Sequence, residues 1–233
     1  MVDKALSFEI SSDFAFFRRG YTTTSALTYS VPPKTAVSGL IAAILGRKWT
    51  NYHIPLSTSF ISIRILSPIR KIVIKENLLE TKEGQKGRIQ VPFEYLRYPK
   101  YKVYFYKEGE PYSELKTLLE RHNTHFTPYL GIAKCIADIK YTGEVQVNDI
   151  KSSYSEVYIS SVIPFDKVAE SQIILENGKR YARERTSSSM DEHRIVTKFT
   201  DILYELSGDK IKTKGGNYSI VKSEEKTDNV IFF

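Results

Sequence analysis

Segment 18–35, RRGYTTTSALTYSVPPKT, places cationic, hydroxyl and aromatic side chains close together. Guanidinium groups fork onto phosphates, hydroxyl groups bond to phosphate or 2′-OH oxygens, and tyrosine rings stack on unpaired bases. Lys34 and Thr35 add a cation and free backbone N–H groups at the start of a predicted helix, which favours an anion there. The candidate RNA-contacting residues here are Arg18, Arg19, Tyr21, Thr22, Thr23, Lys34 and Thr35. The alternative is a polar loop whose hydroxyl groups bond to its own backbone.

Three other residues could support metal-independent RNA cleavage. That reaction needs a base for the 2′-OH, an acid for the leaving oxygen and a cation for the phosphorane. His122 and His125 could supply the proton transfers, with Arg121 beside them and Tyr52 assisting. The alternative is structural: His122 ends a helix, where a cation is favoured, and His125 orients the next loop. We favour the structural interpretation, so the sequence predicts no catalytic residue.

The sequence predicts neither a metal site nor a cofactor. No carboxylate or cysteine lies at ligand spacing from the two histidines, and the single cysteine, Cys135, has the alternating neighbours of a core position. Glu76, Glu80 and Glu83 have near-helical spacing that indicates a solvated surface. Segment 180–185, RYARER, fits an RNA contact, a subunit contact or an exposed strand equally well.

The elements that position these residues follow from the spacing of apolar side chains. Helical spacing predicts a helix that begins after Pro32-Pro33 and ends before Gly46, and a second helix capped by Ser113. Segment 80–90 is predicted to be an exposed loop. Alternation predicts strands at 5–10, 61–65, 69–74, 101–106 and 132–141.

The predicted fold class is α+β. Strand, helix, strand, strand, helix and strand over residues 1–150 form the ferredoxin-like, RRM-like βαββαβ plan. Residues 151–233 are predicted to form a smaller, mostly β domain. Within it, Asn177-Gly178 predicts a two-residue hairpin and Gly215-Gly216 another turn. Residues 230–233 pack back as an edge strand or dock on a partner.

Charge is distributed unevenly along the chain. The 233 residues include 34 Lys and Arg against 27 Asp and Glu, a net charge of +7. Residues 1–100 hold 15 basic and 7 acidic side chains, whereas residues 101–233 hold 19 and 20. A localised basic surface is expected for a phosphate-backbone partner, although a solvated face without a partner has the same composition.

Composition also excludes several classes of protein. An apolar content of 41% excludes wholesale disorder, and one cysteine excludes a disulfide scaffold. No run approaches the roughly 20 apolar residues that a membrane span needs. The first residues show no signal peptide, so a cytoplasmic location is predicted.

Two blocks of the sequence resemble a known family. FAFFRRGYTTTSALTYSVPPKTAVSGLIAAILG, at 14–46, is similar to the N-terminal signature of the CRISPR-associated Cas-five family, in which an aromatic-arginine loop leads through Pro-Pro-x-Thr into a small-residue helix. HFTPYLGIAKCIADIKYTGE, at 125–144, is similar to the family's Pro-Tyr-Leu-Gly block. The resemblance implies a RAMP-superfamily subunit of a type I Cascade complex, with an RRM-like domain.

The resemblance also implies partners. Relatives hold the repeat-derived 5′ handle of the crRNA and project a hairpin, the thumb, between the second and third strands toward the guide RNA and the first backbone subunit. Here the thumb would fall within residues 76–97, with Lys82, Lys86 and Arg88 as its cations. The implied protein partners are the Cascade backbone subunit and the large PAM-reading subunit, with target DNA contacted indirectly. No membrane partner is expected.

The sequence therefore predicts a non-catalytic RNA-binding subunit that caps the crRNA 5′ handle and supports assembly for antiviral DNA interference. Segment 18–35 and the adjoining sheet face would grip the handle. One alternative is a precursor-crRNA endoribonuclease using His122, His125 and Tyr52; the other is a protein-interaction domain with an incidental basic face. Similar proteins of the I-C type cleave with a tyrosine and a Lys–His pair. The nearest match here is Arg121-His122, which favours a I-B-like subtype because arginine is a poor proton donor.

Overall fold

The central strands form where apolar side chains alternate. Strand β1 (Lys4–Ser11) lies between β6 (Lys100–Tyr106) and β7 (Asp138–Ile159), and β6 also pairs with β3 (Phe60–Ile65). All three pairings are antiparallel, and the order β7-β1-β6-β3 is the middle of a seven-stranded sheet. Three of the predicted strands are therefore confirmed.

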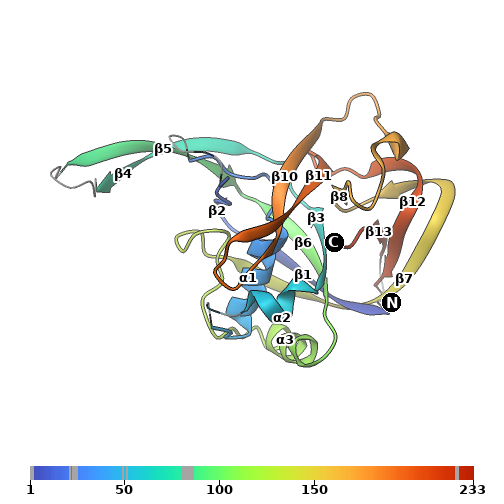
Figure 1. Cartoon of the computed structure of the whole chain (residues 1–233), viewed down its shortest axis with the longest axis horizontal. Coiled ribbons are helices and arrows are strands. Elements are labelled where there is room, and N and C mark those ends of the chain that lie inside the picture. The colour runs from blue at the N-terminus through green and yellow to red at the C-terminus, as the bar shows by residue number, and fades with distance from the viewer. Residues whose placement is uncertain are drawn as a thin grey trace.

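The computed structural model describes residues 3–20, 22, 26–48, 50, 52–79, 87–223 and 226–233. Figure 1 shows a body of sheets and short helices from which one long hairpin projects. Of the helices within these ranges, none has the length and apolarity that crossing a membrane requires.

Helix α1 (Lys34–Ile44) begins and ends where its sequence predicts. Pro33 precedes it with a φ of −56°, and Gly46 follows it with a φ of +67°. The N–H groups of Gly46 and Arg47 donate to carbonyl oxygens of the last turn at 3.3 and 2.9 Å. These two bonds form a Schellman motif, in which glycine takes the left-handed position without strain.

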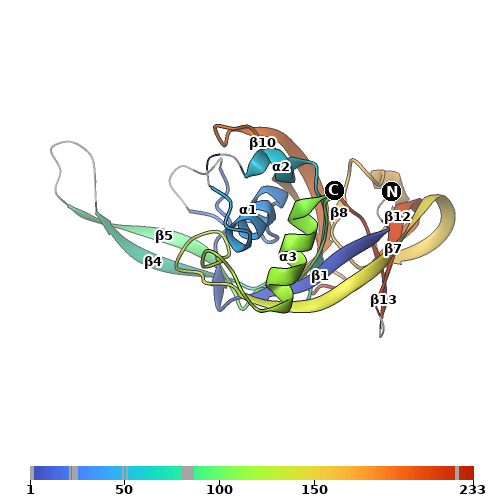
Figure 2. The same cartoon turned by 90° about the horizontal axis from the view of Figure 1, so that it is seen from below.

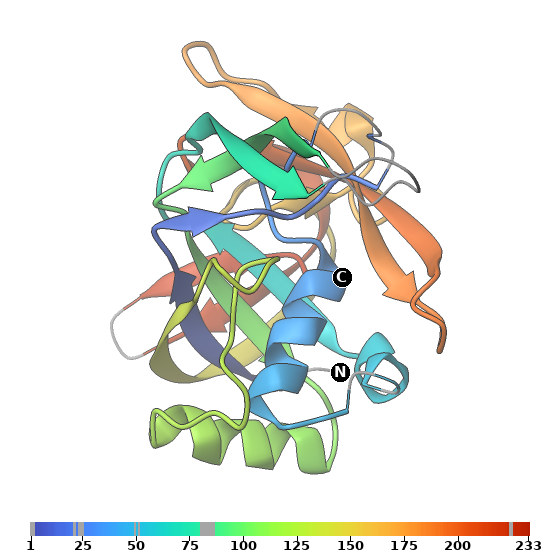
Figure 3. The ribbon, with the colours of Figure 1, turned by 90° about the vertical axis from the view of Figure 1, so that its left-hand side faces the viewer.

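Helices α1 and α3 (Glu110–Glu120) cover the same face of the sheet, as Figure 3 shows, while the short helix α2 (His53–Ser57) follows α1 in the chain. One hydrophobic core joins the helices to the strands. Its members include Leu6, Phe8, Ile10, Val37, Leu40, Ile41, Ile44, Ile61, Ile63, Val103, Phe105, Leu115 and Leu119. Burial of this apolar face stabilises the helices, because 11-residue helices are marginal on their own.

The opposite face of these strands is also covered. Tyr104 and Ser62 are 2% and 0% exposed, and Tyr104 packs with Ala5, Val221 and Val230. The sheet is therefore covered at these positions, and the predicted grip of the adjoining sheet face on RNA stays a prediction. The cover is the C-terminal region, which the chain folds back over this side.

The chain between β3 and β6 forms a two-stranded hairpin that projects from the body (Figures 1 and 2). Strands β4 (Lys71–Leu79) and β5 (Arg88–Arg97) pair antiparallel along its length, and β2 (Phe14–Ala15) pairs with the base of β5. This is the place predicted for the thumb. Residues 88–90 belong to β5, so the predicted loop over 80–90 is wrong there, and residues 80–86 lie outside the described ranges.

The C-terminal region adds strands to the main sheet. Strand β12 (Ile211–Lys222) pairs with β7, with β13 (Thr227–Val230) and with the short β9 (Ile173–Ile174), which follows the 3-10 turn η1 (Glu170–Gln172). Because β7 runs through residue 150, the predicted regions 1–150 and 151–233 share one sheet. The division into two domains stays a prediction.

A separate three-stranded sheet lies over α1. Strand β11 (Val196–Glu205) pairs with β10 (Tyr181–Met190) and with β8 (Ile163–Pro164), and β10 packs against α1. This contact brings residues from the second half of the chain beside the 18–35 segment.

Two predicted turns have a different role. Gly178 has a φ of +84° in a turn, but the flanking strands β9 and β10 pair with β12 and β11, so no hairpin forms. Gly215 and Gly216 lie within β12, where the register against β7 shifts. Both have positive φ, so they form an irregularity in a continuous strand.

Two predicted boundaries also move. Helix α3 begins at Glu110 after Gly109, so Ser113 lies inside it; Pro111 suits the first turn because it has no N–H to leave unpaired. Strand β7 begins at Asp138, so the prediction of strand from 132 is wrong for its first six residues.

The chain end packs back as an edge: Phe233 and Ile61 exchange backbone hydrogen bonds of 3.0 and 3.2 Å.

Candidate nucleic-acid interface

A groove with a volume of about 730 Å³ lies beside α1. Its walls are segment 16–18, α1 itself, the chain just after α1, loop 126–132 and one end of β10 with the turn that follows. We call this cavity the α1 groove. Four separate parts of the sequence therefore meet around the helix that Pro32-Pro33 opens.

The charge of the α1 groove has one sign. The described residues that line it include Arg18, Arg47, Lys48 and Arg194, and they include no aspartate or glutamate. Arg47 forms an ion pair with Glu114 of α3. The other three cations are exposed, and within the described part of the chain their side chains form no ion pair. An anion in the groove would therefore meet unneutralised charge.

Aromatic and hydroxyl side chains complete the lining. Phe126 and Tyr129 are 57% and 44% exposed at one wall, while Phe16, Phe17 and Tyr29 are buried at the base. Exposed rings beside cations are the combination that binds unpaired bases and their phosphates. The hydroxyl groups of the lining belong to Thr35, Thr50, Tyr52, Thr127, Tyr129 and Ser187, with Tyr29 at the base.

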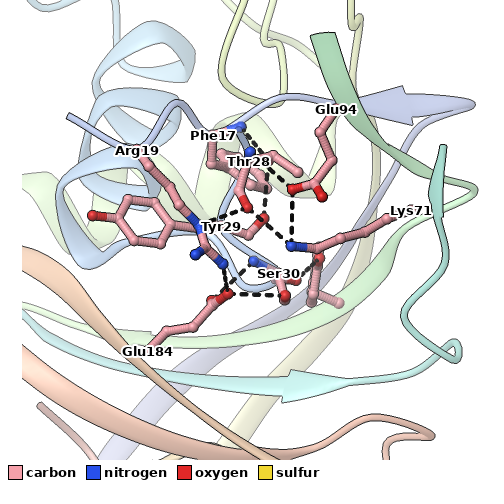
Figure 4. Close-up of polar contacts among 9 residues, drawn as sticks. Phe17, Arg19, Thr28, Tyr29, Ser30, Lys71, Glu94 and Glu184 are labelled. Atoms are coloured by element: carbon pink, nitrogen blue, oxygen red, sulfur yellow. Dashed lines mark hydrogen bonds and ion pairs between the residues drawn. The ribbon is translucent and has the colours of Figure 1, made fainter. Parts of the chain in front are cut away.

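A buried carboxylate holds the 18–35 segment in place (Figure 4). Glu184 of β10 pairs with the guanidinium of Arg19 and accepts hydrogen bonds from the N–H and hydroxyl of Ser30, at 2.9 and 3.1 Å. Arg19 also donates from Nε to the carbonyl oxygen of Thr28 at 3.0 Å and lies 5.5 Å from the ring centroid of Tyr29. The charge of Arg19 is thus paired inside the fold, and its predicted contact with RNA stays a prediction.

The same segment is tied to the base of the projecting hairpin. Thr28 donates its N–H to Glu94 at 3.2 Å, and Lys71 bonds both Glu94 and the carbonyl oxygen of Thr28, at 3.0 and 3.1 Å (Figure 4). The hydroxyl of Thr28 accepts from the N–H of Phe17 at 2.9 Å. Arg18, which lies between these anchors in the sequence, is exposed and lines the groove.

The remaining candidate residues of this segment lie in different surroundings. Thr22 bonds its hydroxyl to the carbonyl oxygen of Arg19 at 3.0 Å, which is the local bonding of the polar-loop alternative. Thr35 lines the α1 groove and shares a hydrogen bond of 2.6 Å with Ser187. Lys34 lines another cavity instead. Tyr21 and Thr23 lie outside the described residues.

Of the three candidates predicted for the thumb, Arg88 alone lies within the described ranges. Arg88 is exposed at the start of β5, opposite Leu79, and is absent from the described lining of the groove. Lys82 and Lys86 lie outside the described ranges. Their predicted RNA contacts stay predictions.

The three alternative catalytic residues do not share the described lining of one cavity. Tyr52 lines the α1 groove, but neither His122 nor His125 is among its described lining residues. Burial raises the pKa of Tyr52, with Tyr129 adding to the shift and Arg194 opposing it, so the phenol stays protonated at neutral pH. This pKa shift disfavours Tyr52 as a base for RNA cleavage.

Both histidines have structural surroundings. His122 follows α3 at a φ of +50°, and its N–H and that of Asn123 donate to carbonyl oxygens of the last turn at 3.2 and 2.9 Å. It thus occupies the left-handed position of a Schellman motif. His125 lies against Gly46, where a Cβ would approach its Cγ to 2.7 Å. Across the described chain, no three His, Cys, Asp or Glu side chains are grouped to hold a metal ion.

Several groove residues were missed at the sequence level. Arg47 and Lys48 directly follow the predicted helix end and belong to the basic first hundred residues, which was a usable signal. Phe126 and Tyr129 lie within the second family-like block. Arg194 carries no such signal, because it reaches the groove only through the packing of β10 on α1.

Comparison with known proteins agrees with this fold. A family described as CRISPR-associated protein (Cas_Cas5) matches residues 5–203. No curated protein matches the chain in sequence. A CRISPR protein from Archaeoglobus fulgidus is similar in structure with a TM-score of 0.56 and 14% identity, covering 97% of this chain and 98% of its own.

Two chains from larger assemblies are also similar. One belongs to a CRISPR RNA-guided surveillance complex, with a TM-score of 0.54, 12% identity and coverage of 89% of this chain and 91% of its own. The other belongs to a type III-B Cmr-beta complex bound to cognate target RNA and AMPPnP, with a TM-score of 0.51, 12% identity and coverage of 88% and 86%. At these identities the likeness shows a shared fold. Since the family match spans most of the sequence, the chain belongs to the CRISPR-associated Cas5 family.

Proposed function

We propose that this chain is a non-catalytic RNA-binding subunit of a CRISPR effector complex, and that the α1 groove holds the 5′ handle of the crRNA. The observation that carries the proposal is the described lining of the groove, with four cations and no carboxylate beside two exposed aromatic rings. RNA offers phosphates to the cations and unpaired bases to the rings. The fold likeness to a chain of an RNA-guided surveillance complex supports this assignment.

The size and position of the groove support single-stranded RNA. A cavity of about 730 Å³ falls in the range of roughly 300–1,000 Å³ that holds a ligand of about one or two nucleotides. Phe126 and Tyr129 both line the groove, and the N–H of Phe126 donates to the carbonyl oxygen of Ala43 in α1 at 3.0 Å. A splayed base would stack on these exposed rings. Arg18, Lys48 and Arg194 would bond phosphates, so affinity would depend strongly on salt.

The projecting hairpin supports a protein partner. Exposed apolar side chains follow both of its strands: Val73, Ile74, Leu78, Leu79 and Ile89. Exposed apolar side chains on an extended hairpin favour contact with another subunit. We assign this contact to a Cascade backbone subunit and assign the large PAM-reading subunit to another face. We also interpret β1, α1, β3, β6, α3 and β7 as the ferredoxin-like unit that the hairpin interrupts.

An RNA-binding measurement tests the proposed groove. We expect Arg18→Ala to weaken binding of a single-stranded repeat RNA by about tenfold at moderate salt, because one phosphate contact is lost. The slope of log affinity against log salt should fall by about one. Arg70→Ala, which removes an exposed arginine outside the lining of the groove, is the matched control and should bind RNA like the unaltered chain. Equal losses in both variants would contradict the groove assignment.

A cleavage assay tests the non-catalytic assignment. We expect labelled repeat RNA to stay intact with the purified chain in EDTA, because Tyr52 and the two histidines do not share a site. Gel analysis after prolonged incubation is the measurement. Cleavage that is lost in Tyr52→Phe or in His122→Ala would establish the endoribonuclease alternative.

A further inference from the structure

A second cavity, of about 280 Å³, lies across the contact between α1 and β10. Thr35 and Ser187 line the α1 groove, whereas their sequence neighbours Lys34 and Ser188 line this second cavity. The register of β10 against β11 shifts between Ser187 and Ser189, and the two cavities have no described lining residue in common. The lining of the second is Lys34, Ser57, Thr58, Ser59, Phe60, Asp166, Lys167, Ser188, Lys198, Thr200, Phe232 and Phe233, and we call it the lysine cavity.

Lys34 is the unusual member of this lining. Its side chain is buried, with only 8% of the residue exposed. Within the described chain, its ammonium group has neither a hydrogen-bond acceptor nor an ion-pair partner. A buried ammonium normally has a counter-charge, because burial without one is strongly unfavourable. Nζ of Lys34 is not among the described buried side-chain atoms that lack a hydrogen-bond partner, so the ammonium group opens into the cavity, where an anion would meet it.

The surrounding charges add to this deficit. Lys167 and Lys198 line the same cavity, and Asp166 is its one acidic side chain among the described residues. The carboxylate of Asp166 lies 3.6 Å from Nζ of Lys198, so it is already shared. Burial first, and then the charges of Lys198 and Lys167, lower the pKa of Lys34 to about 8, although Asp166 opposes them.

The N-terminal end of α1 also favours an anion in this cavity. Lys34 is the first residue of this 11-residue helix, whose first turn has no acidic side chain. The positive end of the helix dipole is therefore not neutralised locally. Three ammonium groups, hydroxyl groups and a helix start around a small cavity match the size and charge of one phosphate.

We propose that the lysine cavity is a phosphate-binding site in which Lys34, Lys167 and Lys198 hold one phosphate group. The phosphate could belong to an RNA backbone or to a free phosphate or nucleotide, since the chemistry is the same. The site does not depend on the proposed RNA contacts of the α1 groove, because the two cavities have no described lining residue in common.

Titration calorimetry of the full chain with inorganic phosphate tests the site. We expect Lys198→Met to weaken phosphate binding by about tenfold, since it removes one charged hydrogen bond. This side chain is 62% exposed, so the variant should fold normally. Lys34→Met should weaken binding at least as much, and methionine suits its buried position. Lys222→Met, an exposed change of the same charge outside the lining, is the matched control and should bind phosphate unchanged.

The pH dependence provides a second readout. Sulfate is the probe here, because its charge is constant between pH 6.5 and 9 whereas phosphate itself titrates. With a pKa of about 8, Lys34 is mostly charged at pH 7 and mostly neutral at pH 9. Sulfate affinity should therefore fall as pH rises through 8 in the unaltered chain. The fall should be much smaller in Lys34→Met, where the titrating group is gone.

Competition identifies the source of the phosphate. If the site holds an RNA phosphodiester, bound repeat RNA will block sulfate and Lys198→Met will weaken RNA binding; if it holds free phosphate, RNA and sulfate will bind together. Either result supports a phosphate site. Absence of phosphate and sulfate binding, or equal binding by Lys34→Met, Lys198→Met and Lys222→Met, would overturn it. Loss of RNA binding in Arg18→Ala alone would leave this proposal intact.

Discussion

Replacement of Glu184 by alanine is expected to lower the free energy of unfolding by about 3 kcal/mol, which is a large share of a small protein's stability. Its carboxylate is buried and binds the guanidinium of Arg19 and two groups of Ser30. Alanine would leave a half-buried positive charge and an unbonded N–H group behind it. This loss of stability is at the lower end of that expected for a broken buried ion pair, because the Arg19 side chain is 20% exposed to solvent.

Urea denaturation at neutral pH measures this loss by linear extrapolation. Glu170→Ala is the matched control, because its side chain is 77% exposed and lies 3.7 Å from Arg183. That variant should stay within about 0.5 kcal/mol of the unaltered chain. Glu184→Gln should be intermediate, because the amide oxygen can still accept from Ser30. Equal stability of Glu184→Ala and Glu170→Ala would show that the carboxylate does not anchor the segment.

Replacement of Gly131 by alanine is expected to destabilise the chain by about 3 kcal/mol and to distort one wall of the α1 groove. Gly131 has a φ of +92°, and a Cβ there would lie 1.9 Å from the carbonyl oxygen of Phe16. This oxygen belongs to the backbone, so no side-chain rotation relieves the clash. Loop 126–132 would have to move away from the segment that carries Arg18, and Tyr129 would move with it.

Gly143→Ala separates this close approach from backbone strain. Gly143 has a similar φ of +108°, but a Cβ there would have nothing within 4 Å. It should cost about 1–2 kcal/mol, from the left-handed conformation alone. Urea denaturation measures both variants, and RNA binding below the unfolding range measures the groove. We expect weaker RNA binding only in Gly131→Ala; similar behaviour of the two variants would show that the approach to Phe16 does not shape the groove.

Together these two substitutions test how the interface is held. Glu184 of β10 fixes the segment that precedes α1. Gly131 lets loop 126–132 approach the same segment closely at Phe16. Arg18 is thereby exposed between two fixed walls, without a rigid element of its own. A groove built in this way keeps its cations in position before RNA arrives, which reduces the ordering entropy that binding would otherwise cost.

Local periodicity was enough to predict the elements around the site. The alternation in β1, β3 and β6 and the helical spacing of α1 were confirmed, as were the limits of α1 set by Pro33 and Gly46. Proline and glycine act through their own φ preferences, and alternation acts through the burial of one face. These causes lie within a few residues of their effects, so a sequence window contains them. The basic excess of the first hundred residues and the family resemblance can likewise be read from the sequence alone.

Only the tertiary structure decided which of the candidate side chains are free. Arg18 and Arg19 are identical neighbours in sequence, yet Arg19 pairs with Glu184, 165 positions away, and Arg18 stays exposed. Likewise Lys34 and Thr35 are adjacent but line different cavities. A charged group's role depends on the nearest opposite charge in space, and packing of β10 on α1 sets that distance. The sequence by itself thus determined the helix, the strands and the basic half of the chain, while long-range packing determined where its charge faces solvent.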